Sequence, residues 1–271
     1  LFPLMLLMLL LLPADMVAQK AASSSKYIAT YESSTQTLTF KEFVGETLPS
    51  NSVVVKDKMT VEDMNTKLGN VTIVHIVFDK SFSTYTPTSL YRFFKDLTKL
   101  ETITGLEYLN TEKVTDMYSM FFNCFSLTSL DVTHFNTANV TDMRFMFYYC
   151  LALTSLDVSH FNTAKVKNMR NMFSNCSSLT SLYLTNFNTE NVTNMGDMFS
   201  NCSSLTTIYA SSKFVTTRVS NSSGMFNKCE KLKGEEVGWT SDKATDKTYA
   251  KIEGGYFSGG IPRVKYADGT L

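Results

Sequence analysis

The chain has 271 residues, 44% of them apolar, and its 25 Lys and Arg residues balance its 25 Asp and Glu residues. That apolar content is sufficient for a folded core. A net charge of zero, without any basic run, gives no electrostatic reason to bind nucleic acid or an anionic membrane. We therefore predict no nucleic-acid partner and no membrane insertion of the mature chain.

The first eighteen residues, LFPLMLLMLLLLPADMVA, predict a secretory signal. An apolar stretch at 4–12 is followed by a polar break and then by Ala18, after which we expect cleavage. The stretch is shorter than the roughly 20 apolar residues of a membrane span. We assign 1–18 to a signal peptide with an incomplete start and 19–25 to a linker. The mature chain is expected to be secreted or held at the cell surface.

Residues 26–87 contain four strand-like runs, KYIATY, TLTFKEF, SVVVKD and VTIVHIVFDKSF, and predict a β-rich N-terminal region and cap. Ile76, in the last run, lies 27 residues before Ile103. We expect this run to form the first strand of the sheet that continues into the repeats.

A repeat occupies residues 88–232. Four cysteines are spaced 26 residues apart and a fifth follows after 27: Cys124, Cys150, Cys176, Cys202 and Cys229. A fixed period of this length predicts a solenoid, in which each unit packs only on its neighbours. The region 233–271 breaks the period with Gly and charged residues, and we assign it to a C-terminal cap and tail.

Each unit is predicted to contain a short helix and a short strand. Met143, Met146, Phe147 and Cys150 have the i, i+3, i+4, i+7 spacing of one helical face. The segment from 153 to 158 then alternates like a strand. The expected fold is an α/β solenoid: a leucine-rich-repeat-like stack with a β-rich N-terminal cap and an irregular C-terminal cap.

The segment FNTANVTDMRFMFYYCLALTSLDVSHFNT resembles the 26-residue repeat of bacterial BspA-like leucine-rich-repeat surface proteins. The resemblance extends over roughly 26–257 and includes the trailing segment DKTYAKIEGGYF. It implies an exported protein at the bacterial surface that adheres to host matrix proteins or to other cells. It supplies no catalytic residues.

The five cysteines are interpreted as structural. An odd number at one repeat position argues against a disulfide framework, and Leu97 occupies the same position in an earlier unit. No CxxC spacing indicates a metal site, and we expect no cofactor. A repeated asparagine is expected to point inward and to bond the backbone of adjacent coils: Asn136, Asn162 and Asn188.

The outward strand positions are the predicted binding site. If Leu130 and Val132 point inward, their neighbours point to solvent. Asp131, Asp157, Tyr183 and Tyr209 should then form one continuous row, flanked by Ser129 and Ser155. Tyrosines and acids among small hydroxyls suit contact with an extracellular protein or glycan.

Two histidines beside these acids, His134 and His160, are weak candidates for ligands of a divalent ion. We interpret them instead as surface residues at turn edges and assign no metal site. No Ser-His-Asp arrangement, phosphate loop or metal-ligand spacing indicates an enzyme. The sequence thus favours a non-enzymatic recognition or adhesion protein that uses the exposed sheet. The alternative is a surface module that binds a glycan or a divalent ion.

Overall fold

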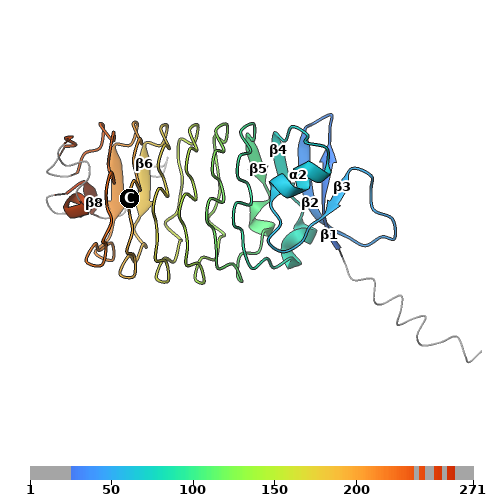
Figure 1. Ribbon diagram of the computed structural model, residues 1–271, viewed down its shortest axis with the longest axis horizontal. Helices are drawn as coiled ribbons and strands as arrows, with labels where there is room; N and C mark the ends of the chain where they lie inside the picture. The colour runs from blue at the N-terminus through green and yellow to red at the C-terminus, as the bar shows by residue number, and fades with distance from the viewer. Residues whose placement is uncertain (1–25, 235–237, 242–246, 252–254, 260–271) are drawn as a thin grey trace, which may run out of the picture.

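The computed structural model describes residues 26–234, 238–241, 247–251 and 255–259. The predicted signal peptide at 1–18, the linker at 19–25 and the end of the tail lie outside the described residues. Figure 1 shows an elongated stack of chain coils, with strands β1–β5 at one end and β6–β8 towards the other. None of the helices in the described part of the chain has the length and hydrophobicity needed to cross a membrane.

The N-terminal end is a five-stranded sheet in the order β3-β1-β2-β4-β5. Antiparallel pairing joins β1 (Lys26–Glu32) to β2 (Thr37–Phe43) and to β3 (Ser52–Val54). Parallel pairing joins β2 to β4 (His75–Phe78) and β4 to β5 (Thr102–Thr104). The predicted strands at 26–78 are confirmed, and so is the predicted neighbour relation, because Ile76 pairs with Ile103.

One α-helix, α2 (Val61–Lys67), belongs to this N-terminal region (Figure 1). Its start is fixed by a capping box, in which the Thr60 side chain accepts the Asp63 N–H and the Asp63 carboxylate accepts the Thr60 N–H. Two short 3₁₀ helices, η1 (Lys80–Thr84) and η2 (Leu106–Tyr108), lead into the coils.

The helix predicted in each repeat is wrong, although its buried face is right. Met143, Met146, Phe147 and Cys150 are all fully buried, but the backbone that carries them is a series of tight turns. Every second N–H leaves the turn and bonds the next coil, as Phe121 N does to Met146 O at 2.8 Å. The N–H groups in between bond three residues back, as Met146 N does to Met143 O.

Left-handed backbone is the reason why these segments are not helices. Two residues per coil, four positions apart, have positive φ; Phe145 and Tyr149 have φ of 58° and 60°. Equivalent pairs recur in the neighbouring coils: Ser119 and Asn123, Asn171 and Asn175, Asp197 and Asn201, Gly224 and Lys228. A right-handed helix cannot pass through such residues, so the N–H groups are free to bond the next coil.

Among the described repeats, the expected strand forms in the first, as β5, and again in two later ones. Strands β6 (Ser181–Leu184) and β7 (Thr207–Ala210) pair in parallel, and β8 (Phe257–Gly259) joins the edge of β7. The segments at 130–133 and 156–159 form no strand. Asp131 and Asp157 would place like charges opposite each other there, which disfavours pairing, whereas Tyr183 and Tyr209 supply a favourable aromatic pair.

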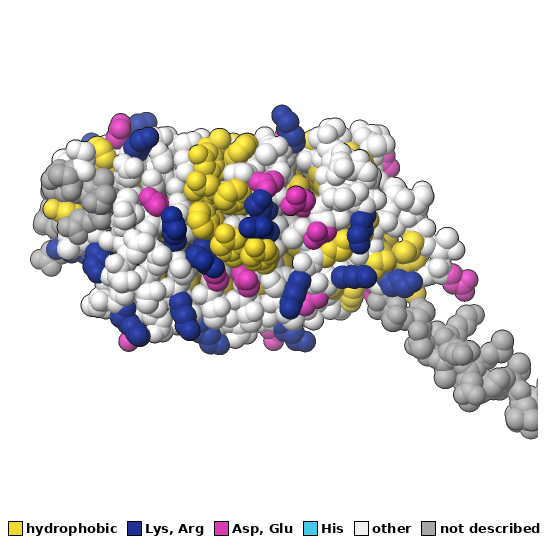
Figure 2. Space-filling view, viewed as in Figure 1, with side chains coloured by type: hydrophobic (Ala, Val, Ile, Leu, Met, Phe, Trp, Pro, Cys, Tyr) yellow, Lys and Arg dark blue, Asp and Glu magenta, His cyan; other side chains and the backbone are white. Residues whose placement is uncertain are grey.

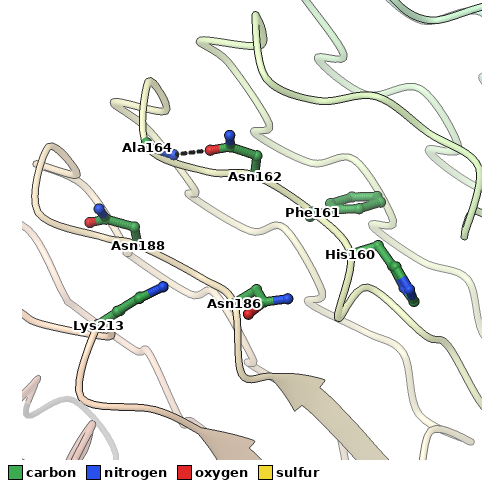
Figure 3. Close-up of a pocket in the computed structure, with 7 residues that line it drawn as sticks. All are labelled: His160, Phe161, Asn162, Ala164, Asn186, Asn188 and Lys213. Carbon is green, nitrogen blue, oxygen red and sulfur yellow. Dashed lines mark hydrogen bonds between the residues drawn. The ribbon is translucent and has the colours of Figure 1, made fainter.

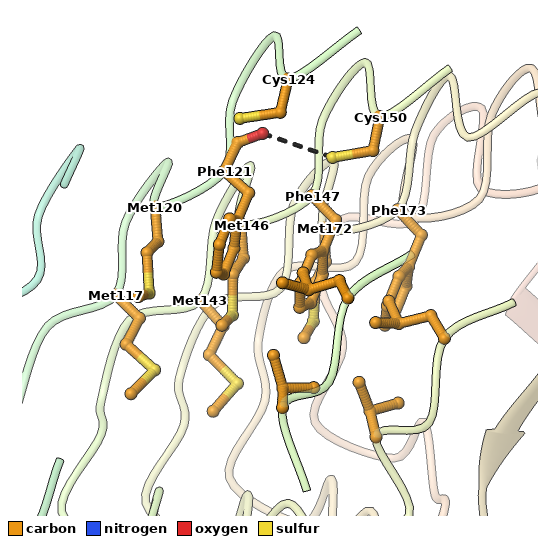
Figure 4. Packing of buried hydrophobic residues seen from close by; sticks show 14 of the residues in the cluster. Met117, Met120, Phe121, Cys124, Met143, Met146, Phe147, Cys150, Met172 and Phe173 are labelled. Atoms are coloured by element: carbon orange, nitrogen blue, oxygen red, sulfur yellow. Dashed lines mark hydrogen bonds between the residues drawn. The ribbon is translucent and has the colours of Figure 1, made fainter. Parts of the chain in front are cut away.

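The core is a set of ladders that run through the stack. One ladder consists of phenylalanine rings stacked with centroids 5.1–5.8 Å apart: Phe94, Phe121, Phe147, Phe173, Phe199 and Phe226. Figure 4 shows three of these rings, Phe121, Phe147 and Phe173, beside methionines and cysteines of the core. Each ring packs on the coil before and the coil after it, so no coil buries its own apolar face alone.

The described part of the C-terminal cap covers the last coil. The Trp239 indole Nε1 donates to the carbonyl oxygen of Phe226 at 2.7 Å. The buried ring of Tyr256 packs edge-on against Phe226, with centroids 5.0 Å apart. The short 3₁₀ helix η3 (Lys247–Tyr249) lies in the same region.

Candidate functional site

All five cysteines lie in the core with free thiols. Each Sγ donates to the carbonyl oxygen of the core phenylalanine one coil earlier, as Cys150 does to Phe121 at 3.3 Å (Figure 4). Burial raises the pKa of every thiol, and that of Cys229 rises to about 12. These groups therefore set the register of the core and are poor nucleophiles and poor metal ligands.

The predicted role of the repeated asparagines is wrong. Asn136 and Asn162 are exposed and Asn188 is half-buried. Each Oδ1 accepts the N–H two residues later in its own coil, as Asn162 does from Ala164 at 3.1 Å. These side chains cap turns and do not bridge coils through the core.

A threonine performs the bridging role instead. Thr111, Thr137, Thr163 and Thr189 each follow a repeated asparagine and are buried to within 3% exposure. The Thr189 hydroxyl donates to Val215 O at 2.6 Å and accepts Val215 N–H at 2.7 Å. A hydroxyl both donates and accepts, so one small side chain satisfies a backbone N–H and C=O of the next coil. The repeated FNT segment carried this signal, which the sequence analysis missed.

The predicted row on the strand face exists only in part. Tyr183 and Tyr209 pair in register and stack, with centroids 4.9 Å apart and planes 10° apart. Both rings are half-buried, and Ser129 and Ser155 are exposed. Asp131 and Asp157 are exposed but belong to coils without strands, so the paired row begins only at Tyr183.

The acids of this row are engaged with their own turns. One Asp131 carboxylate oxygen accepts both the N–H and the hydroxyl of Thr133, at 3.0 and 2.6 Å. The hydroxyl bond, followed by the N–H bond, lowers the pKa of Asp131. Asp157 likewise accepts the Ser159 N–H at 2.8 Å. Both carboxylates therefore cap turns through one oxygen, Oδ1.

The two histidines are exposed at the same edge of the stack. His134 Nδ1 lies 3.2 Å from the Thr133 hydroxyl, and His160 Nδ1 lies 3.2 Å from the Ser159 hydroxyl. Among the described residues, no three His, Cys, Asp or Glu side chains gather closely enough to hold a metal ion.

A surface that sequence analysis missed lies on the turns of the early coils. Tyr91, which is 40% exposed, stacks on Tyr118 with centroids 5.2 Å apart. Phe122 stacks on Tyr148 at 4.9 Å, and Phe145 packs against both stacks. With Phe125 and Tyr149, which touch each other, these rings form what we call the aromatic surface. Figure 2 shows a hydrophobic patch over the coils between β5 and β6, with basic and acidic side chains beside it.

Cations cover part of the aromatic surface. The Arg92 guanidinium lies 5.0 Å from the Tyr91 ring centroid and 5.8 Å from that of Tyr118. Arg144 lies 4.9 Å from the Tyr118 centroid and holds the Asp142 carboxylate through Nε and an Nη. The bond to Asp142 raises the pKa of Arg144. Arg92 is different, because its buried Nε has no hydrogen-bond partner among the residues that the structure describes.

The repeat itself shows that the fold does not require these rings. Phe122 and Tyr148 correspond to Ser174 and Ser200 in the next two coils. Phe145 corresponds to Asn171 and Asp197. The same backbone therefore forms with small polar side chains, and the aromatic surface is an addition that the stack does not need. Aligning the units and asking where they differ would have found it.

A hollow of about 300 Å³ opens at the edge of the stack near His160. Figure 3 shows the side chains of consecutive coils that line it: His160, Phe161, Asn162, Ala164, Asn186, Asn188 and Lys213. As far as the described residues form it, the lining is mainly polar and contains no carboxylate.

Comparison with known proteins identifies the family of these coils. The family model described as "Mycoplasma protein of unknown function, DUF285" matches residues 88–183 and 152–253, which together make up more than half of the chain. The chain belongs to the DUF285 family. The two matches overlap and cover the whole repeat region of this DUF285 protein, together with part of the C-terminal cap.

Among solved structures, a leucine rich cell surface protein from Faecalibacterium prausnitzii A2-165 is similar to 68% of the DUF285 chain, at 18% sequence identity and a TM-score of 0.31. The chain spans about half of that protein, 53% of its length. No curated protein sequence matches the chain.

Proposed function

We propose that this DUF285 protein is an exported, non-enzymatic recognition protein of the BspA-like leucine-rich-repeat type, and that it adheres to an extracellular protein such as a host matrix protein. The signal-like segment at 1–18 supports export. The proposal includes no catalysis, because the sequence holds no nucleophile–base motif, phosphate loop or metal-ligand spacing. Stacked coils with extended exposed faces are suited to macromolecular partners.

The observation that carries this proposal is the aromatic surface. Partly exposed aromatic side chains beside arginines are the residue types that dominate the binding energy of protein interfaces. Here they replace small polar residues that the same coil geometry accepts elsewhere. Keeping such rings at the surface of a soluble protein favours aggregation, so their presence is best explained by a partner that covers them.

The orientation of the rings favours a protein over a neutral glycan. In the Tyr91–Tyr118 and Phe122–Tyr148 pairs, ring faces are stacked on each other, with planes 13° and 25° apart. Stacking covers one face of each ring, and the guanidinium groups of Arg92 and Arg144 lie over the tyrosines of the first pair, which reduces the open ring face further. Edges contact aliphatic and aromatic side chains of another protein well, whereas a sugar ring packs best on an open face.

The strand face is the second surface for the same function, and it is the one predicted from the sequence. It offers the Tyr183–Tyr209 stack beside Ser129 and Ser155 in neighbouring coils. Its exposed aromatic area is limited to two rings, so we assign it the smaller contribution. The ion-binding alternative has no supporting constellation among the described residues.

The test measures binding of the purified protein to a panel of immobilised extracellular matrix proteins. Phe122→Ser combined with Tyr148→Ser introduces the residue of the later coils and should weaken binding by more than about tenfold. Tyr183→Ala with Tyr209→Ala tests the strand face. Val44→Ser is the matched control, because Val44 is an apolar side chain that is 75% exposed outside the repeats.

Each result decides between surfaces. Loss only in the Phe122/Tyr148 variant supports the aromatic surface, and loss only in the Tyr183/Tyr209 variant transfers the function to the strand face. Binding that no variant weakens, or no binding to any member of the panel, contradicts the proposal. Melting temperatures close to that of the wild type show that the variants remain folded.

A further inference from the structure

The hollow at the edge of the stack arises where the repeat changes length. Leu184 and Phe187 are three residues apart, whereas the equivalent Ala210 and Phe214 are four residues apart. All four side chains are buried, so the core keeps its register and the extra residue must be accommodated in the loop between them. Lys213, the last residue of the longer loop, contributes to the wall of the hollow (Figure 3).

Lys213 also places a positive charge at a repeat position that is occupied by other residue types in the preceding coils. The residue just before the core phenylalanine is His134, His160 and Asn186 in the three preceding coils and Lys213 in this one. Within the described part of the chain, its ammonium group has no carboxylate partner, and no Asp or Glu lines the hollow. An ammonium in a hollow without acids favours an anionic group in the ligand.

The amides of the lining add further donors. The Oδ1 atoms of Asn162 and Asn188 already accept N–H groups of their own turns, at 3.1 Å in both cases. Within the described ranges no hydrogen bond uses their two Nδ2 groups, which remain as donors. The Asn186 Nδ2 is used at Ser159 O, which leaves the Asn186 Oδ1 as an acceptor for a ligand hydroxyl.

We propose that this hollow binds one carboxylate-bearing sugar unit, such as a uronic or sialic acid. The Lys213 ammonium pairs with the carboxylate, Asn186 Oδ1 accepts a ring hydroxyl, and the Asn162 and Asn188 amides donate to other polar groups of the sugar. The volume of about 300 Å³ lies at the lower end for small-ligand pockets, which suits a single sugar ring. The site is separate from the aromatic surface and does not depend on it.

The experiment is an NMR titration of the purified protein with glucuronate, N-acetylneuraminate, glucose and inorganic sulfate. The acidic sugars should shift the side-chain amide signals of Asn162 and Asn188, and added salt should weaken their binding. Lys213→Gln should weaken it about tenfold or more, because a charge-assisted hydrogen bond is lost. Lys165→Gln is the matched control, since it removes the same charge outside the lining, where Lys165 bonds Asn139.

A second variant, which keeps the turn hydrogen bond, separates loss of binding from loss of folding. Asn188→Asp keeps the acceptor for Glu190 N–H and replaces an amide donor by an anionic oxygen, so it should also abolish binding. Equal binding of glucose and glucuronate, equal binding of sulfate and the sugars, or acidic-sugar shifts that persist in Lys213→Gln would each overturn the proposal. So would an absence of shifts at Asn162 and Asn188. None of these outcomes bears on protein binding by the aromatic surface.

Discussion

Thr137 makes two hydrogen bonds with the backbone of Asn162 in the next coil. Its hydroxyl accepts the Asn162 N–H at 2.8 Å and donates to the Asn162 carbonyl at 3.1 Å. The side chain is only 2% exposed, so water cannot replace either bond. The contact between coils at this edge therefore depends on one buried hydroxyl.

Replacing Thr137 with Val removes that hydroxyl and keeps the shape of the side chain. We expect a loss of about 1–3 kcal/mol in the free energy of unfolding, because a buried N–H and a buried C=O lose their partner. Urea denaturation measures this loss. Thr141→Val is the matched control, since the Thr141 hydroxyl also bonds the neighbouring coil, at 3.2 Å, but from an exposed residue. Equal losses in the two variants would show that burial of the hydroxyl is not what matters.

The cysteine thiols should be unreactive in the folded protein. Burial raises the pKa of all five, so at about pH 8 the reactive thiolate is much rarer than in an unfolded chain, where the pKa is about 8.5. A colourimetric thiol reagent should modify none of them before unfolding and all five in denaturant. Rapid modification of even one thiol in the native protein would contradict their placement in the core.

Lys228 is expected to be a poor residue for its position. Its φ is +56°, its side chain is exposed, and three of the equivalent positions carry asparagine, which tolerates left-handed backbone: Asn123, Asn175 and Asn201. Lys228→Asn should therefore raise the free energy of unfolding by about 0.5–1 kcal/mol. Lys231→Asn serves as the control, because Lys231 is also exposed but is not left-handed, and it should bring no gain.

The pKa of Asp131 should depend on the hydrogen bonds that it accepts in the turn that it caps. Hydrogen bonds from Thr133 lower its pKa in the folded state, so its stabilising contribution is present above the unfolded pKa of about 3.9 and is lost as the pH falls through the lower folded value. Thr133→Val removes the hydroxyl donor and should raise the pKa of Asp131, as read from its carboxyl ¹³C shift against pH. Thr128→Val, an exposed change nearby, should leave that titration unaltered.

The sequence pattern predicted which side chains are buried better than it predicted the backbone that buries them. Spacing at i, i+3, i+4 and i+7 placed Met143, Met146 and Phe147 in the core correctly. The same spacing is produced by consecutive tight turns, so it does not distinguish them from a helix. The asparagines that precede the cysteines, such as Asn175, were the available sign of left-handed backbone.

The candidate sites show a similar limit. Periodicity identifies what all units share, and the strand row was inferred from that shared pattern. The Lys213 hollow and the aromatic surface arise where units differ from one another, through one inserted residue and through rings in place of serine. Which of these differences lie together at the surface depends on how the coils stack, and a single unit does not contain that information.

The bond from each cysteine to the phenylalanine carbonyl one coil earlier gives the stack a direction. Every coil is held in register by a hydrogen bond to the coil before it. A 26-residue block can therefore be duplicated or deleted between two cysteines without altering the contacts of either cap. The number of coils in the stack can then change during evolution by whole repeats. The distance between the aromatic surface and the Lys213 hollow would change by one coil at each step, which would let related chains match the spacing of different partners.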